Sequence, residues 1–270
     1  MYSRILVPVD GSPFSEQILP FALAIARATG AELDVARVVA DLPDQQEAKE
    51  HTESLAARVG GKALCIVSSD DVASTIRAEA ERVPGTLIAL CTHGRSGAME
   101  AILGSVALRM LRQGGAPLLV YRPVSSAAGG ADEVSKVRTV IVPLDGSPTS
   151  ESIVPQAAEL ARWLGARLMV VSAIEPSQRV SDLVTSGDVL ESSYVHGKAA
   201  DIAERYGVEV GWEVLHGDPK EAIPSFLRTQ PNAVLAMTTR GRGAIETAIV
   251  GSVTAACLRG SGVPVFTRVA

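Results

Sequence analysis

The sequence predicts an α/β protein with two doubly wound, Rossmann-like domains in tandem, each a mostly parallel sheet with helices on both faces. Three observations lead to this fold class. The chain contains an internal repeat. Short β-branched segments alternate with helix-type segments, as in successive βαβ units. Strand-type segments such as 86–90 are almost entirely apolar, which is typical of strands that are buried on both faces of a sheet.

The repeat determines the number of domains. Residues 5–20 (ILVPVDGSPFSEQILP) and 140–155 (VIVPLDGSPTSESIVP) are identical at 10 of 16 positions, at an offset of 135. A second pair, beginning at Thr92 and Thr239, matches at an offset of 147, so the second copy carries 12 extra residues between its second and third strands. The segment 124–136 is small, polar and Gly-rich and predicts a linker. We therefore expect one domain at 1–123 and another at 137–270.

The elements of the first copy follow from the same patterns, taken in order. Apolar and β-branched runs predict strands at 5–9, 32–39, 63–67, 86–91 and 118–121. Helical patterns lie between them, at 13–29, 45–59, 72–83 and 106–113. Ser12-Pro13 and Ser147-Pro148 fit a helix N-cap followed by proline at the first helical position, with Glu16 and Glu151 in the first turn.

Composition excludes several classes of protein. The 270 residues are 47% hydrophobic with a net charge of −5, which does not fit a disordered chain or a general nucleic-acid binder. Three cysteines cannot form a disulfide framework and fit a reducing compartment. No apolar run approaches the roughly 18 residues of a membrane span, and the N-terminus does not have the pattern of a signal peptide. We expect a cytoplasmic protein without nucleic-acid or membrane partners.

Two repeated features lie where a doubly wound sheet binds ligands, beyond the carboxyl ends of its strands. One is the acidic residue after the first strand, Asp10 or Asp145, which either contacts a ribose or cation or orders its own turn. The other is a glycine followed after nine residues by Gly-Ser at a helix start, Gly104-Ser105 or Gly251-Ser252. A helix start offers free N–H groups to a phosphate, although Gly-Ser also serves as a plain turn and cap.

Taken in order, the strand ending in Asp10-Gly11-Ser12, the Thr92-His93-Gly94 segment and Gly104-Ser105-Val106 resemble the universal stress protein family, and the resemblance covers nearly the whole chain twice. It implies five-stranded parallel sheets of order 3-2-1-4-5. One branch of the family binds ATP through the motif G-x2-G-x9-G-[ST], and another lacks the motif and does not bind it. The resemblance therefore implies an adenine nucleotide, ATP with or without Mg²⁺, as ligand.

The family motif transfers residue by residue. Its second glycine matches Gly94 and Gly241, and its third matches Gly104 and Gly251. Its first glycine falls on Cys91 and Thr238, so both copies depart from the motif there. The adenine-flanking position matches Val38 and Ala173. The remaining expected binding residues adjoin these positions: Pro8, Val9, Leu90, Arg95, Ser105, Val106, Pro143, Leu144, Met237, Arg242, Ser252 and Val253.

Several residue types are set aside. The four histidines and three cysteines have no metal-ligand spacing, so no metal site is expected. His93 has arginine as its counterpart and no evident catalytic partner, so no catalytic residue is assigned. Cys65, Cys91 and Cys257 are expected to be small buried hydrophobic residues.

Three hypotheses of function remain open. The first is a regulatory, adenine-nucleotide-binding stress protein. The second is a nucleotide-free binding or scaffold module, favoured by the two substitutions at the first motif glycine. The third is a slow ATPase. We also expect the fifth strands of the two copies to pair within one chain as a pseudo-dimer, because pairing protects an exposed edge, and a homodimer of the whole chain is a further alternative.

Overall fold

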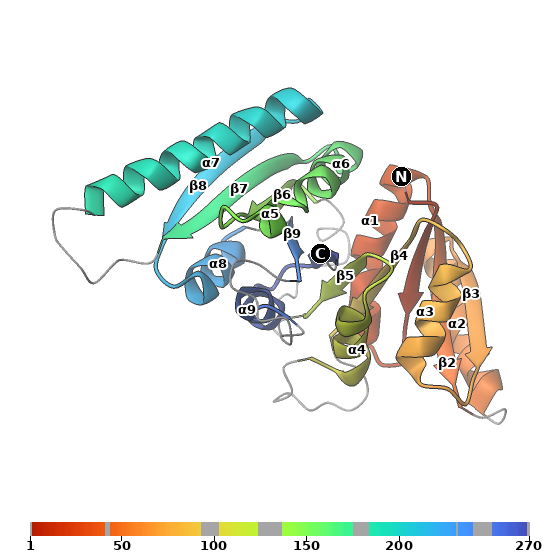
Figure 1. The fold of residues 1–270 in the computed structure, drawn as a ribbon. Coiled ribbons are helices and arrows are strands. Elements are labelled where there is room, and N and C mark those ends of the chain that lie inside the picture. The colour runs from red at the N-terminus through yellow and green to blue at the C-terminus, as the bar shows by residue number, and fades with distance from the viewer. Residues whose placement is uncertain are drawn as a thin grey trace. The chain divides into compact units, whose positions relative to one another are not determined.

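The computed structural model describes residues 2–40, 44–92, 103–123, 137–174, 184–230, 232–239 and 250–268, without the side chains of 113 and 184–191. The chain divides into two compact units, residues 1–136 and 137–268. The predicted linker, 124–136, lies outside the described residues. Each unit is an α/β domain in which helices pack along a sheet (Figure 1).

Unit 1 has a parallel sheet with the strand order β3-β2-β1-β4-β5. Its strands are β1 (Arg4–Pro8), β2 (Glu32–Val39), β3 (Lys62–Val67), β4 (Thr86–Cys91) and β5 (Leu118–Tyr121). Its helices are the 3₁₀ helix η1 (Ser15–Ile18), α1 (Leu19–Thr29), α2 (Gln45–Val59), α3 (Val72–Glu81) and α4 (Ser105–Gln113). The order reverses direction after β3, so right-handed crossovers place α1 and α2 on one face and α3 and α4 on the other.

Unit 2 repeats this topology in the order β8-β7-β6-β9-β10. Its strands are β6 (Thr139–Pro143), β7 (Arg167–Ile174), β8 (Val210–His216), β9 (Ala233–Thr238) and β10 (Val265–Arg268). Its helices are α5 (Pro148–Glu151), α6 (Val154–Leu164), α7 (Val184–Tyr206), α8 (Pro219–Arg228) and α9 (Ser252–Gly260). Both sheets therefore confirm the predicted order, 3-2-1-4-5.

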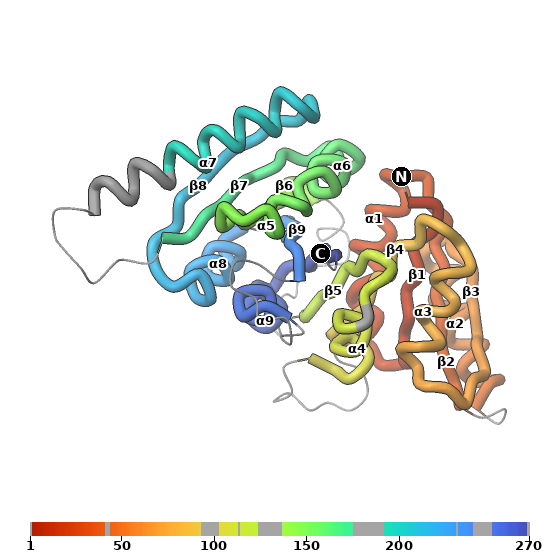
Figure 2. The backbone as a smooth tube through the Cα atoms, viewed as in Figure 1, coloured from red at the N-terminus to blue at the C-terminus, as the bar shows by residue number. Residues whose placement is uncertain are grey.

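The additional residues of the second copy fall where the repeat offsets place them, between β7 and β8. Part of the insertion lengthens the helix: α7 has 23 residues and α2 has 15. Figure 2 shows α7 as the long helix along β8. Both α2 and α7 end where the chain turns into the third strand of the unit, at Gly60 and Gly207, each with a positive φ.

The predicted helix at 13–29 is wrong in its first part. The chain forms a turn and then η1, and α1 begins only at Leu19. Pro20 has no N–H group to donate to the Glu16 carbonyl, as a continuous α-helix would require. The Leu19 N–H instead bonds to the Glu16 carbonyl, a tighter 3₁₀ contact. In unit 2 the expected cap is confirmed, since the Ser147 side chain accepts a hydrogen bond from the Ser150 N–H.

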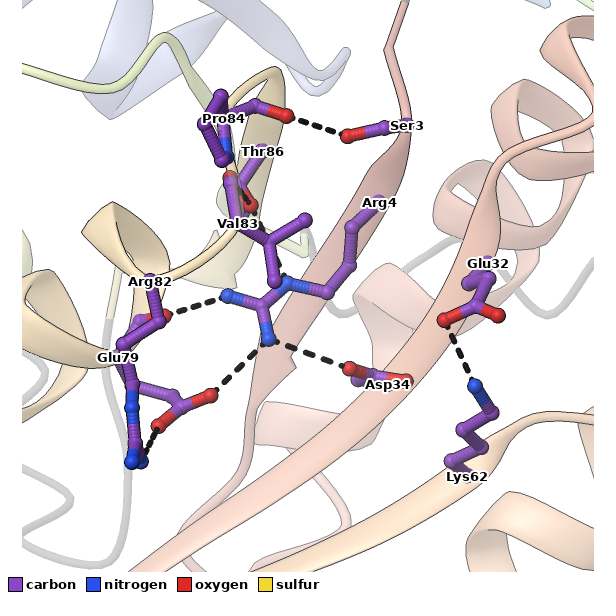
Figure 3. A network of polar contacts seen from close by, with 10 residues as sticks. All are labelled: Ser3, Arg4, Glu32, Asp34, Lys62, Glu79, Arg82, Val83, Pro84 and Thr86. Atoms are coloured by element: carbon purple, nitrogen blue, oxygen red, sulfur yellow. Dashed lines mark hydrogen bonds and ion pairs between the residues drawn. The ribbon is translucent and has the colours of Figure 1, made fainter.

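A buried polar cluster lies at the opposite end of the unit 1 sheet from the strand ends that carry the motifs. The Arg4 guanidinium, on β1, contacts Asp34 on β2 and Glu79 on α3 (Figure 3). It also donates to the Thr86 hydroxyl at 3.1 Å. The Arg4 side chain thus joins β1 to three other elements of the unit, namely β2, α3 and β4.

Candidate functional site

The turn after the first strand has the same hydrogen bonds in both units. In unit 1 the Asp10 Oδ1 atom accepts from the Ser12 N–H at 3.0 Å and from the Ser12 hydroxyl at 2.6 Å. In unit 2 the Asp145 Oδ1 atom accepts from Ser147 at the same two distances, 3.0 and 2.6 Å. Of the two alternatives for this carboxylate, ordering of its own turn is therefore observed.

A second serine completes each turn and was missed in the sequence analysis. The Ser15 N–H donates to the Ser12 hydroxyl at 3.2 Å, and the Ser15 hydroxyl accepts from the Asp10 N–H at 3.3 Å. Ser150 makes the corresponding contacts in unit 2, at 3.1 and 3.3 Å. The available signal was the identical serine five residues after the aspartate in both copies.

The start of α4 presents backbone donors. Gly104 is the N-cap residue and supplies no side-chain cap. Its own N–H donates to the Thr92 carbonyl, which joins the end of β4 to the helix start. The equivalent bond in unit 2, from the Gly251 N–H to the Thr239 carbonyl, is 2.7 Å long. The next N–H groups of each helix have no side-chain cap, as an anion site requires.

In unit 1 these features border one cavity of about 510 Å³. Every described site residue predicted for this unit lines it: Pro8, Val9, Asp10, Val38, Leu90, Cys91, Gly104, Ser105 and Val106. Gly94 and Arg95 lie outside the described residues. The volume falls within the range of about 300–1,000 Å³ that is typical of small-molecule sites.

Ten further residues line the cavity and were not predicted. They are Ser15, Arg37, Val39, Ala40, Asp44, Glu47, Val72, Ile76, Thr92 and Ala107. Asp44 and Glu47, at the start of α2, add two carboxylates to that of Asp10. Val72 and Ile76, on α3, extend the apolar wall. The cavity thus combines backbone donors, an apolar wall and three carboxylates, with one arginine.

In unit 2 the predicted residues occupy the same places on the fold. Pro143 and Leu144 lie at the end of β6, and Ala173 lies in β7. Met237 and Thr238 end β9, and the latter's carbonyl accepts from the Thr254 hydroxyl at 3.1 Å. Gly251, Ser252 and Val253 form the start of α9. Gly241 and Arg242 lie outside the described residues.

The residues at the first motif glycine are the last of their strands. Cys91 is 8% exposed and Thr238 is 4% exposed. Burial raises the pKa of the Cys91 thiol to about 12, so it is neutral at physiological pH. Cys257 is likewise buried, as expected, whereas Cys65 is only half-buried because β3 is an edge strand of unit 1.

One glutamate links the first helical turn to the second long helix in each unit. In unit 1, Glu16 pairs with His51 at 3.2 Å. In unit 2, Glu151 pairs with Lys198 at 2.7 Å and accepts from the Tyr194 hydroxyl at 2.9 Å. The offsets of 135 and 147 make Glu16 equivalent to Glu151 and His51 equivalent to Lys198, so both units have this contact, with a different basic residue in each.

Neither a metal cluster nor a membrane-spanning helix is found in the part of the chain that the structure describes. No cluster of three or more His, Cys, Asp or Glu side chains there has an arrangement suited to a metal ion. No described helix has the length and apolar character needed to cross a membrane. His93, set aside as a catalytic base, lies outside the described residues.

Comparison with known proteins gives consistent results. The universal stress protein family profile matches residues 1–122 and 136–267. A universal stress protein of Methanocaldococcus jannaschii is 23% identical over 136 residues, 48% of this chain and 80% of that protein. One of Mycobacterium tuberculosis is 28% identical over 190 residues, 67% of this chain but only 60% of that protein's length.

Solved structures share the fold over nearly the whole chain. A universal stress protein from Archaeoglobus fulgidus superposes with a TM-score of 0.66 at 23% identity, covering 98% of this chain and 96% of its own. A protein from Pseudomonas aeruginosa gives a TM-score of 0.70 at 18% identity, covering 99% and 92%. With two family matches that together span most of its length, this chain belongs to the universal stress protein family and carries two family domains in tandem.

Proposed function

We propose that the protein is a cytoplasmic, nucleotide-binding regulator of the stress response and that it binds ATP. One observation carries the proposal. A single cavity of unit 1 joins the Asp10 turn, the Val38 position of β2 and the start of α4. These are the three places where the family motif expects ribose, adenine and phosphate.

The phosphate end is the start of α4. The N–H groups of Ser105, Val106 and Ala107 come after an N-cap glycine, and all three residues line the cavity. Unpaired N–H groups and the positive end of the helix dipole favour an anion at such a place. The Ser105 hydroxyl supplies one more donor.

The base end lies toward β2. Val38 lines the cavity on this side, and Val72 and Ile76 of α3 add apolar surface. A purine ring buries apolar faces while its edge requires polar partners, which matches a mainly apolar pocket with a few polar groups. Asp10, whose Oδ1 atom is held by Ser12, lies between the two ends as the partner for a ribose hydroxyl.

Three carboxylates line the same cavity, those of Asp10, Asp44 and Glu47. A bare triphosphate would be repelled by them. We therefore expect ATP to enter with Mg²⁺, since the cation reduces the negative charge of the phosphates. A chelator that removes Mg²⁺ should therefore lower the affinity for ATP.

Calorimetry of the full chain with MgATP tests the proposal. Ser105→Glu and Ser252→Glu each place a carboxylate at a proposed phosphate position, and both serines are exposed, so the fold should tolerate the change. Each variant should weaken binding at its own unit by about tenfold or more through like-charge repulsion. Ser54→Glu, with the same charge change on the exposed side of α2, is the matched control and should bind as the wild type does.

Absence of heat at millimolar ATP in the wild type would refute the proposal. Equal weakening by Ser54→Glu and Ser105→Glu would refute the assigned phosphate position. Chromatography of the nucleotide released when the purified protein is denatured identifies the natural ligand without a prior choice of compound.

A further inference from the structure

Arg37 has an unusual environment for a charged residue. It lies near the carboxyl end of β2, is 6% exposed and lines the unit 1 cavity. Arginine is almost never this buried unless its charge is paired. Among the described residues, however, no side chain or carbonyl forms a hydrogen bond or an ion pair with the Arg37 guanidinium.

Arg4 of the same unit shows what a satisfied buried arginine looks like. It is 4% exposed, and its guanidinium reaches Thr86, Asp34 and Glu79 (Figure 3). A buried guanidinium without acceptors would carry a large desolvation penalty. Among the described residues, Arg37 therefore lacks acceptors of the kind that Arg4 has, and the cavity that it lines is where a ligand can supply them.

The strand order indicates which part of a ligand would supply them. β2 and β4 lie on either side of β1, and neighbouring strands are about 4.8 Å apart, so the two are separated by roughly 10 Å. The phosphate position follows β4, at the start of α4. Arg37 belongs to β2 and lines the cavity, so its backbone lies about one nucleoside's length from that position, at the end assigned to the base.

We infer that Arg37 recognises the edge of a purine base and makes unit 1 prefer a 6-oxopurine nucleotide over a 6-aminopurine nucleotide. The inference rests on the proposed function, because it requires a nucleotide in the cavity, and under it ATP binds at unit 1 but more weakly than GTP does. A guanidinium only donates hydrogen bonds, in a fork. The O6 and N7 atoms of guanine are adjacent acceptors that match this fork, whereas adenine offers N7 beside an amino donor.

Unit 2 has no arginine at the position of Arg37. The offset of 135 places Ser172 at the equivalent position, and it is 2% exposed. A serine hydroxyl can donate or accept, so it discriminates little between the two kinds of base. The two halves of the chain should therefore differ in their selectivity for the base, although both carry the same turn and helix-start features.

The experiment uses the full chain with Ser252→Glu, which weakens nucleotide binding at unit 2. Calorimetry measures the dissociation constants of MgGTP and MgATP before and after Arg37→Ser, the residue that unit 2 carries. The inference predicts preference for GTP with Arg37 and a loss of that preference, by about tenfold, in the variant. Arg37→Lys keeps the charge but not the fork and should also lose most of the preference.

The reciprocal variant is the matched control. Ser172→Arg, in a chain with Ser105→Glu, should raise the GTP-to-ATP preference of unit 2. Circular dichroism establishes that each variant is folded. If both nucleotides bind and neither Arg37 variant changes their ratio, the inference is wrong and the proposed function stands. If the Ser252→Glu chain binds neither nucleotide, the inference is wrong, and the titration of the wild type with MgATP then decides the proposed function.

Discussion

Removing the Arg4 charge should destabilise unit 1 strongly. The guanidinium lies 3.0 Å from the Glu79 carboxylate and 3.4 Å from that of Asp34. The two carboxylate side chains are only 13% and 6% exposed, so water cannot replace the lost partner. Arg4→Met retains a long apolar stem but removes the ion-pair partner of Asp34 and leaves Glu79 with Arg82 alone, at 3.0 Å. Breaking a buried ion pair from one side costs about 3–5 kcal/mol of the free energy of unfolding.

Unit 2 provides the matched control for this perturbation. The repeat offsets place Thr139, Met169 and Phe226 at the positions of Arg4, Asp34 and Glu79. The same fold is therefore built there without the three charges. Replacement of a buried ion cluster by apolar residues of similar size is often neutral or stabilising. The triple variant R4T/D34M/E79F should thus retain most of the stability that Arg4→Met loses.

Urea unfolding provides the assay. Far-UV circular dichroism follows both units, whereas the only two tryptophans, Trp163 and Trp212, both belong to unit 2. The Arg4→Met variant should shift the dichroism transition of unit 1 and leave the tryptophan transition largely in place. A loss below about 1 kcal/mol in Arg4→Met, or an equal loss in the triple variant, would refute the reasoning about buried charge.

Three further outcomes are expected. Burial raises the pKa of Asp34 above 3.8, so the folded state binds the proton of this carboxyl group more tightly than the unfolded state does. The contribution of Asp34 to the free energy of unfolding therefore falls as the pH rises from 3.8 through the raised pKa. Asp34→Asn should abolish this pH dependence in urea titrations. A hydrogen bond from the Ser74 hydroxyl is the main cause that lowers the pKa of Asp71 to about 2. The ionised Asp71 therefore stabilises the folded state fully above pH 3.8, and this stabilisation is lost as the pH falls toward 2. Asp71→Asn should remove this pH dependence in an acid titration followed by circular dichroism. Iodoacetamide should modify Cys65 in the native protein and Cys91 only after unfolding, and mass spectrometry that finds native Cys91 alkylated first would contradict its burial.

The strands could be predicted closely from the sequence. Those at 32–39, 86–91 and 118–121 were predicted at the bounds that the structure gives, and those at 5–9 and 63–67 differ by one residue. Buried parallel strands are continuous apolar runs, and turn residues mark their ends clearly. The prediction of a continuous helix at 13–29 was wrong because the hydrophobic pattern gives no information on the backbone N–H group that Pro20 lacks.

The cavity was predictable in part. Asp10 and Gly104-Ser105 were found because the same residues occur in both copies of the repeat, each time after a predicted strand. Arg37 was missed because it lies within a strand that is otherwise apolar, and its counterpart in the repeat is Ser172. Asp44 and Glu47 were missed because acidic residues at a helix start are common on solvent-exposed surfaces, and only the fold brings this helix start to the cavity.

Hydrogen exchange at the start of α4 tests the central claim most directly. The amides of Ser105, Val106 and Ala107 would donate to the phosphates of a nucleotide in the unit 1 cavity. Saturating MgATP should therefore slow their exchange in the wild type, and Ser105→Glu should abolish the effect at the same concentration of ATP. Binding of ATP that leaves the exchange of these three amides unchanged would contradict the account.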